Sequence, residues 1–336
     1  MKKKLTERCI DINTPYCPCL LAETNNCIFC NHLNGGAVCD CNWGGVCILY
    51  EKLWKKNKIA KTKQLDFDLP TPIRTELETE FKIKEQINAN TYVIEFGVSE
   101  ILAESLNKIG SFVFLRRPSD KEFYHFPVGV MSVDDTKITV AIEAIGPKST
   151  RIFSDENRSL FVRGPYFNGV FGQPWIENLT NSKVVLLAGG IGQAPALPIL
   201  KKLIENENEV KAILAPGKVG SIFIKEEFES SEIEVIEVDS LRKYGLKLMK
   251  DCIETNNFAP ELIVSAGPDE QHFSIITAMK DINVNIPMAA TNNSTMCCGE
   301  GICGSCQRKT KDNKTVRCCK DQIDFRDLDL SHLNQD

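Results

Sequence analysis

Cysteine is concentrated in two parts of this sequence. Of the fifteen cysteines in 336 residues, six lie between Met296 and Cys319 and eight lie in the first fifty residues. Disulfides, structural zinc and iron–sulfur clusters are three chemistries that could use so many thiols. An odd count fits a closed disulfide framework poorly, and the N-terminus MKKKLTERCIDINTPYCPC has no apolar run that would make it a secretory signal. We therefore predict metal binding in a cytoplasmic protein, where thiols stay reduced.

Three of the C-terminal cysteines have the spacing of a plant-type [2Fe–2S] site. Cys298, Cys303 and Cys306 follow the pattern C-x4-C-x2-C, and Cys319 can supply a fourth thiolate. The glycines between them give a loop the backbone freedom to wrap a cluster. Structural zinc is the alternative, but zinc sites usually pair two C-x2–4-C knuckles, whereas here three thiols fall within nine residues and the fourth is distant. The spacing favours the cluster.

The N-terminal cysteines have no fixed spacing. Residues 1–50 are rich in Cys, Asn and Gly and have little apolar sequence for a core, so we expect a bound metal to stabilise them. A further iron–sulfur cluster is the first expectation, and one or two structural zinc ions are the second. The candidate ligands, of which the pattern selects no subset, are Cys9, Cys17, Cys19, Cys27, Cys30, Cys39, Cys41 and Cys47.

The sequence between the two cysteine-rich parts predicts two kinds of domain. Residues 69–177 contain β-rich runs such as TYVIEFGV and KITVAIEAIG separated by turn residues, which indicates an antiparallel barrel or sandwich. From Lys183 the pattern becomes apolar strand, glycine turn, helix and strand, the order of a βαβ unit, and we assign residues 178–290 to this domain. A lysine-rich linker over 51–68 precedes the β domain, and residues 291–336 form a small cysteine module with a charged tail. The expected fold class is thus multidomain, all-β plus α/β.

The glycine turn LLAGGIGQAP could bind a dinucleotide. Gly190 and Gly192 follow an apolar strand, and Pro195 falls in the first turn of the expected helix. Glycine lets a diphosphate approach the amides at a helix N-terminus, although many strand–helix turns need glycine for geometry alone. After the next strand, Lys218 stands where an acidic residue would hold a ribose 2′-hydroxyl, so the sequence leaves NADH and NADPH open.

Neither a membrane span nor a nucleic-acid partner is predicted. The longest apolar run, VVLLAGGIGQAPALPIL, has 17 residues and is interrupted by three glycines and two prolines, which makes it unsuitable for crossing a bilayer. Residues 1–64 carry ten Lys and Arg against five Asp and Glu, while the whole chain has a net charge of −5. A basic excess of this size is weak support for nucleic-acid binding.

Five short strings resemble, in order, segments of the ferredoxin–NADP reductase superfamily. IGSFVFLRRP resembles its PGQFVxLR strand, FPVGVMSV stands at the place of the flavin-lining RxPxSI, and AIGPKST resembles the GxGT turn that holds the FAD diphosphate. RGPYFNGVF resembles GPLGNGF, which joins the flavin and nucleotide domains, and SAGP resembles the CGP turn near the nicotinamide. The resemblance implies an FAD-binding β-barrel followed by a Rossmann-like NAD(P)-binding domain. The arginine of RxPxSI is missing here, since His125 and Phe126 precede Pro127.

The resemblance also implies which residues contact each cofactor. For the flavin they are Tyr124, His125, Pro127, Ser132, Gly146, Ser149, Thr150, Gly164, Pro165 and Asn168. For the nicotinamide dinucleotide they are Gly190, Gly192, Pro195, Gly267 and Pro268.

The C-terminal string MCCGEGICGSC…RCCKD resembles the [2Fe–2S] module of the electron-transfer subunit of dihydroorotate dehydrogenase type B, whose motif is MxCGxGxCxxC…CKD. With the flavin and nucleotide strings, this resemblance covers about residues 70–325. Its register implies the four cluster ligands named above and leaves Cys297 and Cys318 as neighbours of the cluster. The Cys-rich N-terminal segment departs from that family, whose subunit begins near the barrel, and indicates a different electron-transfer partner.

The family resemblance implies an electron relay. Reduced nicotinamide would pass a hydride to FAD, and single electrons would reach a partner redox subunit or a ferredoxin-like carrier through the [2Fe–2S] cluster. No catalytic acid, base or nucleophile is expected, since the cofactors carry the chemistry. Two other classes remain open: a non-enzymatic redox or metal sensor, which predicts no NADH-dependent dye reduction, and a zinc-bearing scaffold, which predicts a colourless protein.

Overall fold

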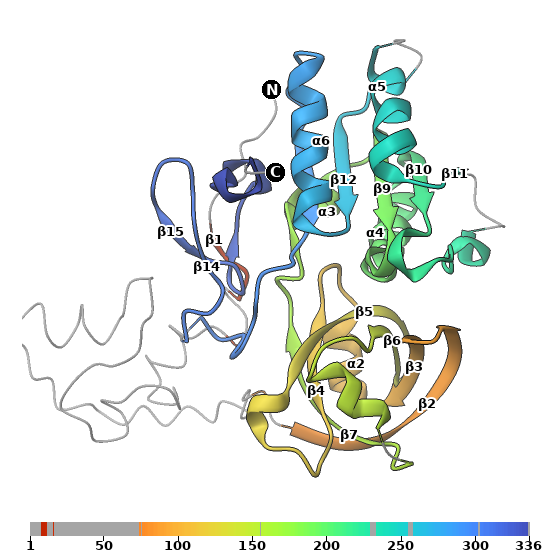
Figure 1. The fold of residues 1–336 in the computed structure, drawn as a ribbon, viewed down its shortest axis with the longest axis vertical. Helices are drawn as coiled ribbons and strands as arrows, with labels where there is room; N and C mark the ends of the chain where they lie inside the picture. Colours follow the sequence, from red (N-terminus) through yellow and green to blue (C-terminus); the bar gives the residue numbers. More distant parts are fainter. Residues whose placement is uncertain are drawn as a thin grey trace, which may run out of the picture.

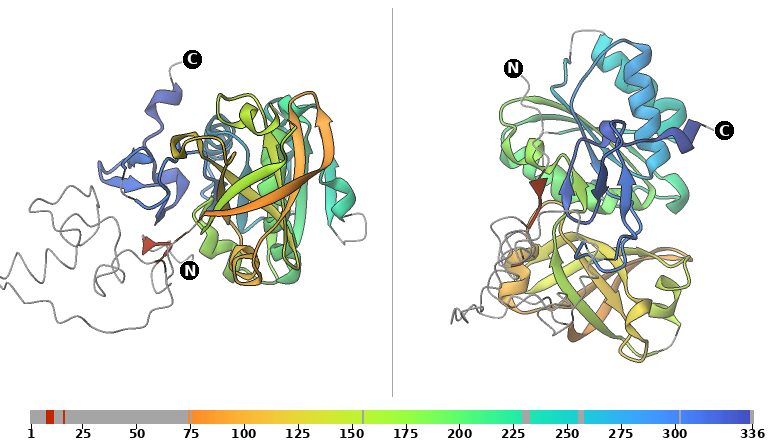
Figure 2. Two further views of the ribbon diagram at one scale, coloured as in Figure 1. Left: turned by 90° about the horizontal axis from the view of Figure 1, so that it is seen from below. Right: turned by 90° about the vertical axis from the view of Figure 1, so that its left-hand side faces the viewer.

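A β-barrel, a parallel-sheet domain and a small C-terminal module that lies beside both make up the structure, a computed structural model (Figures 1 and 2). The residues that it describes are 8–11, 16, 74, 76–154, 156–228, 233–254, 258–301 and 303–334. The predicted linker over 51–68 and seven of the eight N-terminal cysteines lie outside these residues; Cys9 lies within them.

Six antiparallel strands close the barrel in the order β2-β3-β6-β5-β4-β7. Alternate side chains fill it: Ile94 and Phe96 of one strand point inward and lie opposite Val140 and Ile138 of the next. Closure removes exposed strand edges. The predicted antiparallel β domain is confirmed, and it is a barrel rather than a sandwich. The strands are β2 (Glu76–Asn88), β3 (Thr91–Gly97), β4 (Phe112–Arg116), β5 (Phe126–Asp134), β6 (Lys137–Glu143) and β7 (Ser159–Tyr166).

Three short helices connect strands of the barrel. Ser99 begins the first of them, because its side-chain oxygen accepts a hydrogen bond from the amide of Leu102. Ala103 and Leu106 of the same helix are buried against the barrel core. The helices are α2 (Glu100–Leu106), η2 (Glu122–Tyr124) and η3 (Ser149–Phe153).

The second domain is a six-stranded sheet in the order β11-β10-β9-β12-β13-β8. Its central strands are mostly apolar, as expected where helices cover both faces: α4 packs on one face, and α5 and α6 on the other. The α/β prediction is confirmed. The parallel strands are β9 (Lys183–Gly189), β10 (Glu209–Ala215), β11 (Glu234–Glu237), β12 (Leu262–Ala266) and β13 (Met288–Thr291). The helices are α3 (Gln173–Asn178), α4 (Gln193–Glu205), α5 (Leu246–Glu254) and α6 (Asp269–Asp281), with short turns η4 (Gly190–Gly192), η5 (Gly217–Val219), η6 (Lys225–Phe228) and η7 (Leu241–Gly245).

One short strand connects the barrel to the sheet. After β7 the chain forms β8 (Val170–Phe171), which runs antiparallel to β13 at the sheet edge. The amide of Asn292, just beyond β13, donates to the carbonyl of Gly169 at 2.9 Å. The exit from the barrel and the start of the C-terminal module are therefore held side by side.

The C-terminal module is a small hairpin with a short third strand. Hairpin strands β14 (Gln307–Lys309) and β15 (Thr315–Arg317) pair with each other, and β16 (Asp321–Gln322) pairs with β1 (Arg8–Cys9) from the start of the chain. Buried Phe325 and Leu328 join the core that α6 also covers. Turns η8 (Phe325–Asp327) and η9 (Ser331–Asn334) follow. Within the described ranges, no helix has the length and apolar character that crossing a membrane would require.

Replacing Gly192 by alanine should destabilise the fold. A Cβ there would lie 2.5 Å from the carbonyl oxygen of Ala266 and 2.8 Å from the amide nitrogen of Gly267, and backbone atoms cannot move aside cheaply. We expect Gly192→Ala to lower the free energy of unfolding by about 1–3 kcal/mol in urea denaturation. Gly97→Ala is the control, because its Cβ would meet no atom within 4 Å. Equal stability of both variants would contradict this prediction.

Candidate functional site

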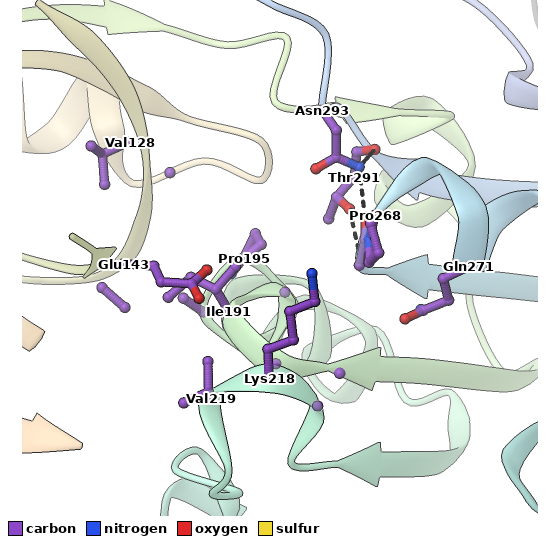
Figure 3. Close-up of a pocket in the computed structure, with 18 of the residues that line it drawn as sticks. Val128, Glu143, Ile191, Pro195, Lys218, Val219, Pro268, Gln271, Thr291 and Asn293 are labelled. Atoms are coloured by element: carbon purple, nitrogen blue, oxygen red, sulfur yellow. Dashed lines mark hydrogen bonds between the residues drawn. The ribbon is translucent and has the colours of Figure 1, made fainter. Parts of the chain in front are cut away.

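A cleft of about 860 Å³ opens where the barrel meets the parallel sheet. Strands β5 and β6 form one wall, and the loops after β9, β10, β12 and β13 form the other. Ligands of open α/β sheets bind at the carboxyl ends of the strands, and these loops all follow such ends. In Figure 3, Glu143 of the barrel lies near Pro195 and Ile191, and Lys218 extends from the other side of the cleft.

The loops after β9 and β10 meet at two glycines. Gly190 and Gly217 both have positive φ, at 56° and 55°, and a Cβ on Gly217 would lie 2.7 Å from the amide nitrogen of Gly190. Buried Gln193 at the start of α4 fixes this arrangement: its side chain donates to the Ser221 carbonyl and accepts from the Phe223 amide, both at 3.0 Å. The N-terminus of α4 thus faces the cleft, and with Lys218 it could bind phosphate groups.

A hydrogen-bonded group behind the loop after β12 holds the other end of the cleft. His272 is fully buried, with Nδ1 2.6 Å from Ser265 Oγ and Nε2 3.0 Å from the Thr291 carbonyl. The hydroxyl of Thr291 accepts from the Gly267 amide at 3.1 Å, and the side chain of Asn293 donates to the Gly267 carbonyl at 2.6 Å (Figure 3). These bonds fix Gly267 and Pro268, whose backbone lines the cleft.

The structure brings seven of the fifteen predicted cofactor-contacting residues into this one cleft. Pro127 and Ser149 lie on the barrel side. All five residues predicted for the nicotinamide dinucleotide lie on the sheet side. The lining residues from the prediction are Pro127, Ser149, Gly190, Gly192, Pro195, Gly267 and Pro268.

Two further predicted residues support the cleft from behind. Ser149 Oγ accepts from the Gly146 amide at 3.2 Å, and Thr150 Oγ1 donates to the Gly146 carbonyl at 2.8 Å. Gly146 and Thr150 therefore shape the turn that presents Ser149 without lining the cleft.

The other predicted flavin contacts lie elsewhere. Tyr124 packs under the guanidinium of Arg151, 4.3 Å from its ring centre, and Ser132 pairs with Thr139 inside the barrel sheet. Gly164 and Pro165 lie near the end of β7, where the Pro165 carbonyl accepts from Arg74.

His125 connects the barrel to the cysteine loop. Its Nε2 lies 2.5 Å from the carbonyl oxygen of Cys297, and its Nδ1 lies 3.4 Å from Arg163. Burial, followed by the positive charge of Arg163, lowers the pKa of His125 from its usual value. The His125 ring therefore contacts the cysteine loop, and His125 does not line the cleft.

Asn168 lies at the junction of barrel, sheet and C-terminal module. Its fully buried side chain donates to the Cys318 carbonyl at 2.7 Å and accepts from Gln322 at 2.7 Å. The Asn292 side chain donates to the carbonyl oxygens of both Asn168 and Cys318. Asn168 therefore fixes the backbone at Cys318 against the barrel exit.

The cysteine loop has the backbone geometry that its glycines predicted. Gly299, Gly301 and Gly304 all have positive φ, between 71° and 76°. A Cβ at Gly299 would lie 2.6 Å from the ring of Tyr166, so the loop also packs closely on the barrel end. The amide of Glu300 donates to Cys298 Sγ at 3.2 Å. Amide-to-sulfur bonds of this kind occur around iron–sulfur clusters and influence their potentials.

Four of the six C-terminal thiols form two pairs. The thiols of Cys298 and Cys303 are within hydrogen-bonding reach of each other, and so are those of Cys306 and Cys319. The hydrogen bond from Cys319 lowers the pKa of Cys306 to about 6. In contrast, burial raises the pKa of Cys318 to about 12, and a hydrogen bond with Ser294 acts in the opposite direction.

The donor set fits an iron–sulfur site. The four predicted ligands form the two contacting pairs. Cys297 is exposed, and Cys318 bonds to the Cys306 carbonyl through its backbone amide at 3.1 Å, while its thiol bonds to Ser294. Thiolates and a glycine loop with an amide directed at sulfur match the requirements of such a cluster. In the part of the chain that the structure describes, no three His, Cys, Asp or Glu side chains converge closely enough to surround a single metal ion. The [2Fe–2S] assignment therefore stays a prediction.

Several cleft residues were missed from the sequence. Glu143, Gln271, Asn293 and Met296 line the cleft, and each is a lone polar or apolar residue at a strand end, in a loop or in the first turn of a helix, without a motif. Met296 is the most informative of them, because it is buried, lines the cleft, and lies two residues before Cys298. One short segment is thus both a wall of the cleft and the start of the cysteine loop.

Acidification should destabilise the protein partly through His272. Burial lowers the pKa of His272 from 6.5 to about 4. Between pH 6.5 and pH 4, His272 is therefore protonated in the unfolded chain and neutral in the folded chain. Stability should therefore fall as the pH drops from 6.5 towards 4, by on the order of 3 kcal/mol from this group alone. Urea denaturation of wild type and His272→Gln across this range measures the effect. The variant should show the shallower pH dependence, and equal slopes would contradict the assignment.

Comparison with known proteins supports the similarity that the motifs indicated. No family model matches the sequence. The chain is 25% identical over 254 residues to the dihydroorotate dehydrogenase B (NAD(+)) electron transfer subunit of Clostridium perfringens, which covers 74% of this chain and 97% of the relative. It is 29% identical over 255 residues to the subunit of the same name from Streptococcus pneumoniae serotype 4, with 73% and 97% covered.

A solved structure has a similar fold. The NADH-dependent reduced ferredoxin–NADP oxidoreductase, studied for flavin-based electron bifurcation, superimposes with a TM-score of 0.61 at 18% identity and covers 76% of this chain and 91% of that one. The predicted resemblance is confirmed: in sequence the chain is similar to dihydroorotate dehydrogenase B electron transfer subunits, and in fold to a ferredoxin–NADP oxidoreductase.

Proposed function

We propose that this chain is the electron-transfer component of an NAD(P)H-dependent flavin and iron–sulfur oxidoreductase. The observation that carries the proposal is the continuity of the two sites. The segment from Thr291 to Met296 lines the cleft and leads directly into Cys298. A group bound in the cleft therefore lies against the same backbone that holds the predicted cluster ligands.

The cleft offers what a flavin and a dinucleotide need. Backbone of the loops around Gly190 and Gly267 can approach a diphosphate and a nicotinamide closely, and Lys218 adds a positive charge for phosphate. The barrel side, with Pro127 and Ser149, would hold FAD. When bound, FAD accepts a hydride and the [2Fe–2S] cluster takes single electrons. The chain's own residues bind and orient these groups, and no side-chain acid or base is assigned.

The cysteine loop would hold the cluster through Cys298, Cys303, Cys306 and Cys319. Gly299 and its neighbours keep the loop close to the barrel end, and the Glu300 amide is directed at the Cys298 sulfur. Hydrogen bonding and burial would then set the reduction potential. Both features are formed by residues of this chain alone.

The proposed division follows the predicted limits: FAD on 69–177, NAD(P) on 178–290 and the [2Fe–2S] cluster on 291–336. The Cys-rich segment over 1–50 would bind a further iron–sulfur cluster or zinc. The relatives are named as subunits, which supports a redox partner subunit or a ferredoxin-like carrier as the electron acceptor for this chain. We place this function in the cytoplasm.

Serine substitutions test the assignment of ligands. In anaerobically purified protein reduced with NADH, Cys298→Ser and Cys319→Ser should abolish the [2Fe–2S] EPR signal, because each removes a thiolate ligand. Cys297→Ser is the matched control: its exposed thiol neighbours Cys298 and should leave the signal intact. NADH-dependent reduction of a small dye should persist in all three variants, since hydride transfer to FAD does not need the cluster.

Three other experimental results would each point to a different explanation. Loss of the EPR signal in Cys297→Ser would show that the ligand register is wrong. A wild-type protein with flavin and iron but no NADH-dependent dye reduction would support a sensor. A colourless wild type that contains zinc would support a scaffold and contradict the proposed function.

A further inference from the structure

Four charged side chains that are far apart in the sequence meet in a buried cluster beside the cysteine loop. Arg74 lies 3.0 Å from Asp11 and 2.7 Å from Glu300, and the Lys320 ammonium contacts both carboxylates. Asp11 is 0% exposed and Lys320 1% exposed. We call these four residues the charge cluster; the two positive and two negative side chains make it formally neutral.

Arg74 of the charge cluster also contacts two tyrosines. The Arg74 guanidinium is sandwiched between the rings of Tyr16 and Tyr166, with its centre 4.6 and 4.5 Å from their centroids. Tyr16 precedes residues 17–73 and Arg74 follows them. Its Nε also donates to the Pro165 carbonyl at 2.5 Å. Tyr16 and Arg74 are therefore held together at the end of the barrel.

Backbone pairing places residues 8–10 against the chain that directly follows Cys318 and Cys319. Strand β1 pairs with β16, so that Cys9 lies opposite Asp321, and the Ile10 amide donates to the Lys320 carbonyl at 2.7 Å. Lys320 directly follows Cys319, a predicted ligand. The contact therefore uses both main chain and charge.

The charge cluster is also next to the first ligand. Glu300 lies inside the cysteine loop, and its amide donates to Cys298 Sγ while its carboxylate binds Arg74 and Lys320. Removing one member of a buried ion pair leaves its partner charged and unpaired, which is strongly destabilising. The loop conformation around Cys298 therefore depends on Asp11, nearly three hundred residues away, because Asp11 balances both cations that hold Glu300.

We propose that residues 8–11 are an integral part of the C-terminal cluster site, with Asp11 as a positioning residue that holds the loop through Arg74 and Lys320 and sets the reduction potential of the bound cluster. This inference rests on the proposed function for the presence of the cluster. The contacts of Asp11 with Arg74 and Lys320 do not depend on the proposed function.

The sign of the effect on potential follows from charge. Reduction adds an electron, so a net positive charge nearby stabilises the reduced cluster and raises its potential. Asp11→Asn changes the formal charge of the charge cluster from neutral to positive. Lys320→Gln changes it to negative. The double variant is neutral again and keeps the Arg74–Glu300 pair.

Redox titration monitored by the [2Fe–2S] EPR signal tests this. Asp11→Asn should shift the midpoint potential upward, Lys320→Gln downward, and the double variant should return towards wild type. Asp120→Asn is the matched control, because Asp120 is a buried carboxylate paired with Arg117 and Arg151 on the barrel, and its potential should stay near that of wild type. Unchanged potentials in both single variants would overturn the role of Asp11 at the cluster.

Thermal unfolding tests the contact itself and needs no cluster. Asp11→Asn and Lys320→Gln should each lower the midpoint temperature, and the double variant should lose clearly less than the two losses added together. If a single variant is too unstable to purify, recovery of folded protein in the double variant demonstrates the same coupling. Strictly additive losses would overturn the proposed contact. A wild type without an EPR signal but with this coupling would contradict the proposed function and leave the contact of residues 8–11 with the C-terminal module supported.

Discussion

The antiparallel pairing of β8 with β13 is the constraint on which the arrangement of both sites depends. Val170 lies opposite Thr291 and Phe171 opposite Ala290, so the chain leaving the barrel is bonded to the last parallel strand of the sheet. Because β13 ends there, the next residues must run between barrel and sheet. They form a wall of the cleft and then the cysteine loop.

This junction explains why the buried polar residues around it are amides. Asn168, Asn292 and Gln322 satisfy backbone carbonyls where three chain segments meet without regular pairing. Buried carbonyls without partners would each cost about 1–3 kcal/mol, and an amide side chain offers two donors without introducing a charge.

The main domains could be predicted from the sequence because their signals are local. The strand–glycine–helix pattern around Gly190 and the alternation in the barrel strands each reflect neighbours within about ten residues. The spacing of Cys298, Cys303 and Cys306 is also local. The structure gives the loop the positive φ angles its glycines allow, and the two thiol pairs contain the four cysteines that the resemblance implied.

Side-chain roles that depend on distant contacts could not be predicted. A motif placed Asn168 and His125 at the flavin, but Asn168 binds the Cys318 carbonyl 150 residues away and His125 binds that of Cys297, 172 residues away. Asp11 gave no signal among the N-terminal cysteines, since its partners Arg74 and Lys320 are 63 and 309 residues distant. The choice between barrel and sandwich also depended on closure between β2 and β7, which no local pattern encodes.

The central claim is that the cleft and the cysteine loop act as one electron path. Its most direct test is anaerobic addition of NADH to the oxidised protein, with visible absorption and EPR recorded on the same sample. The shared segment from Thr291 to Met296 predicts that the flavin band bleaches and that a reduced [2Fe–2S] signal then appears. A flavin that bleaches while the cluster stays oxidised would contradict the claim.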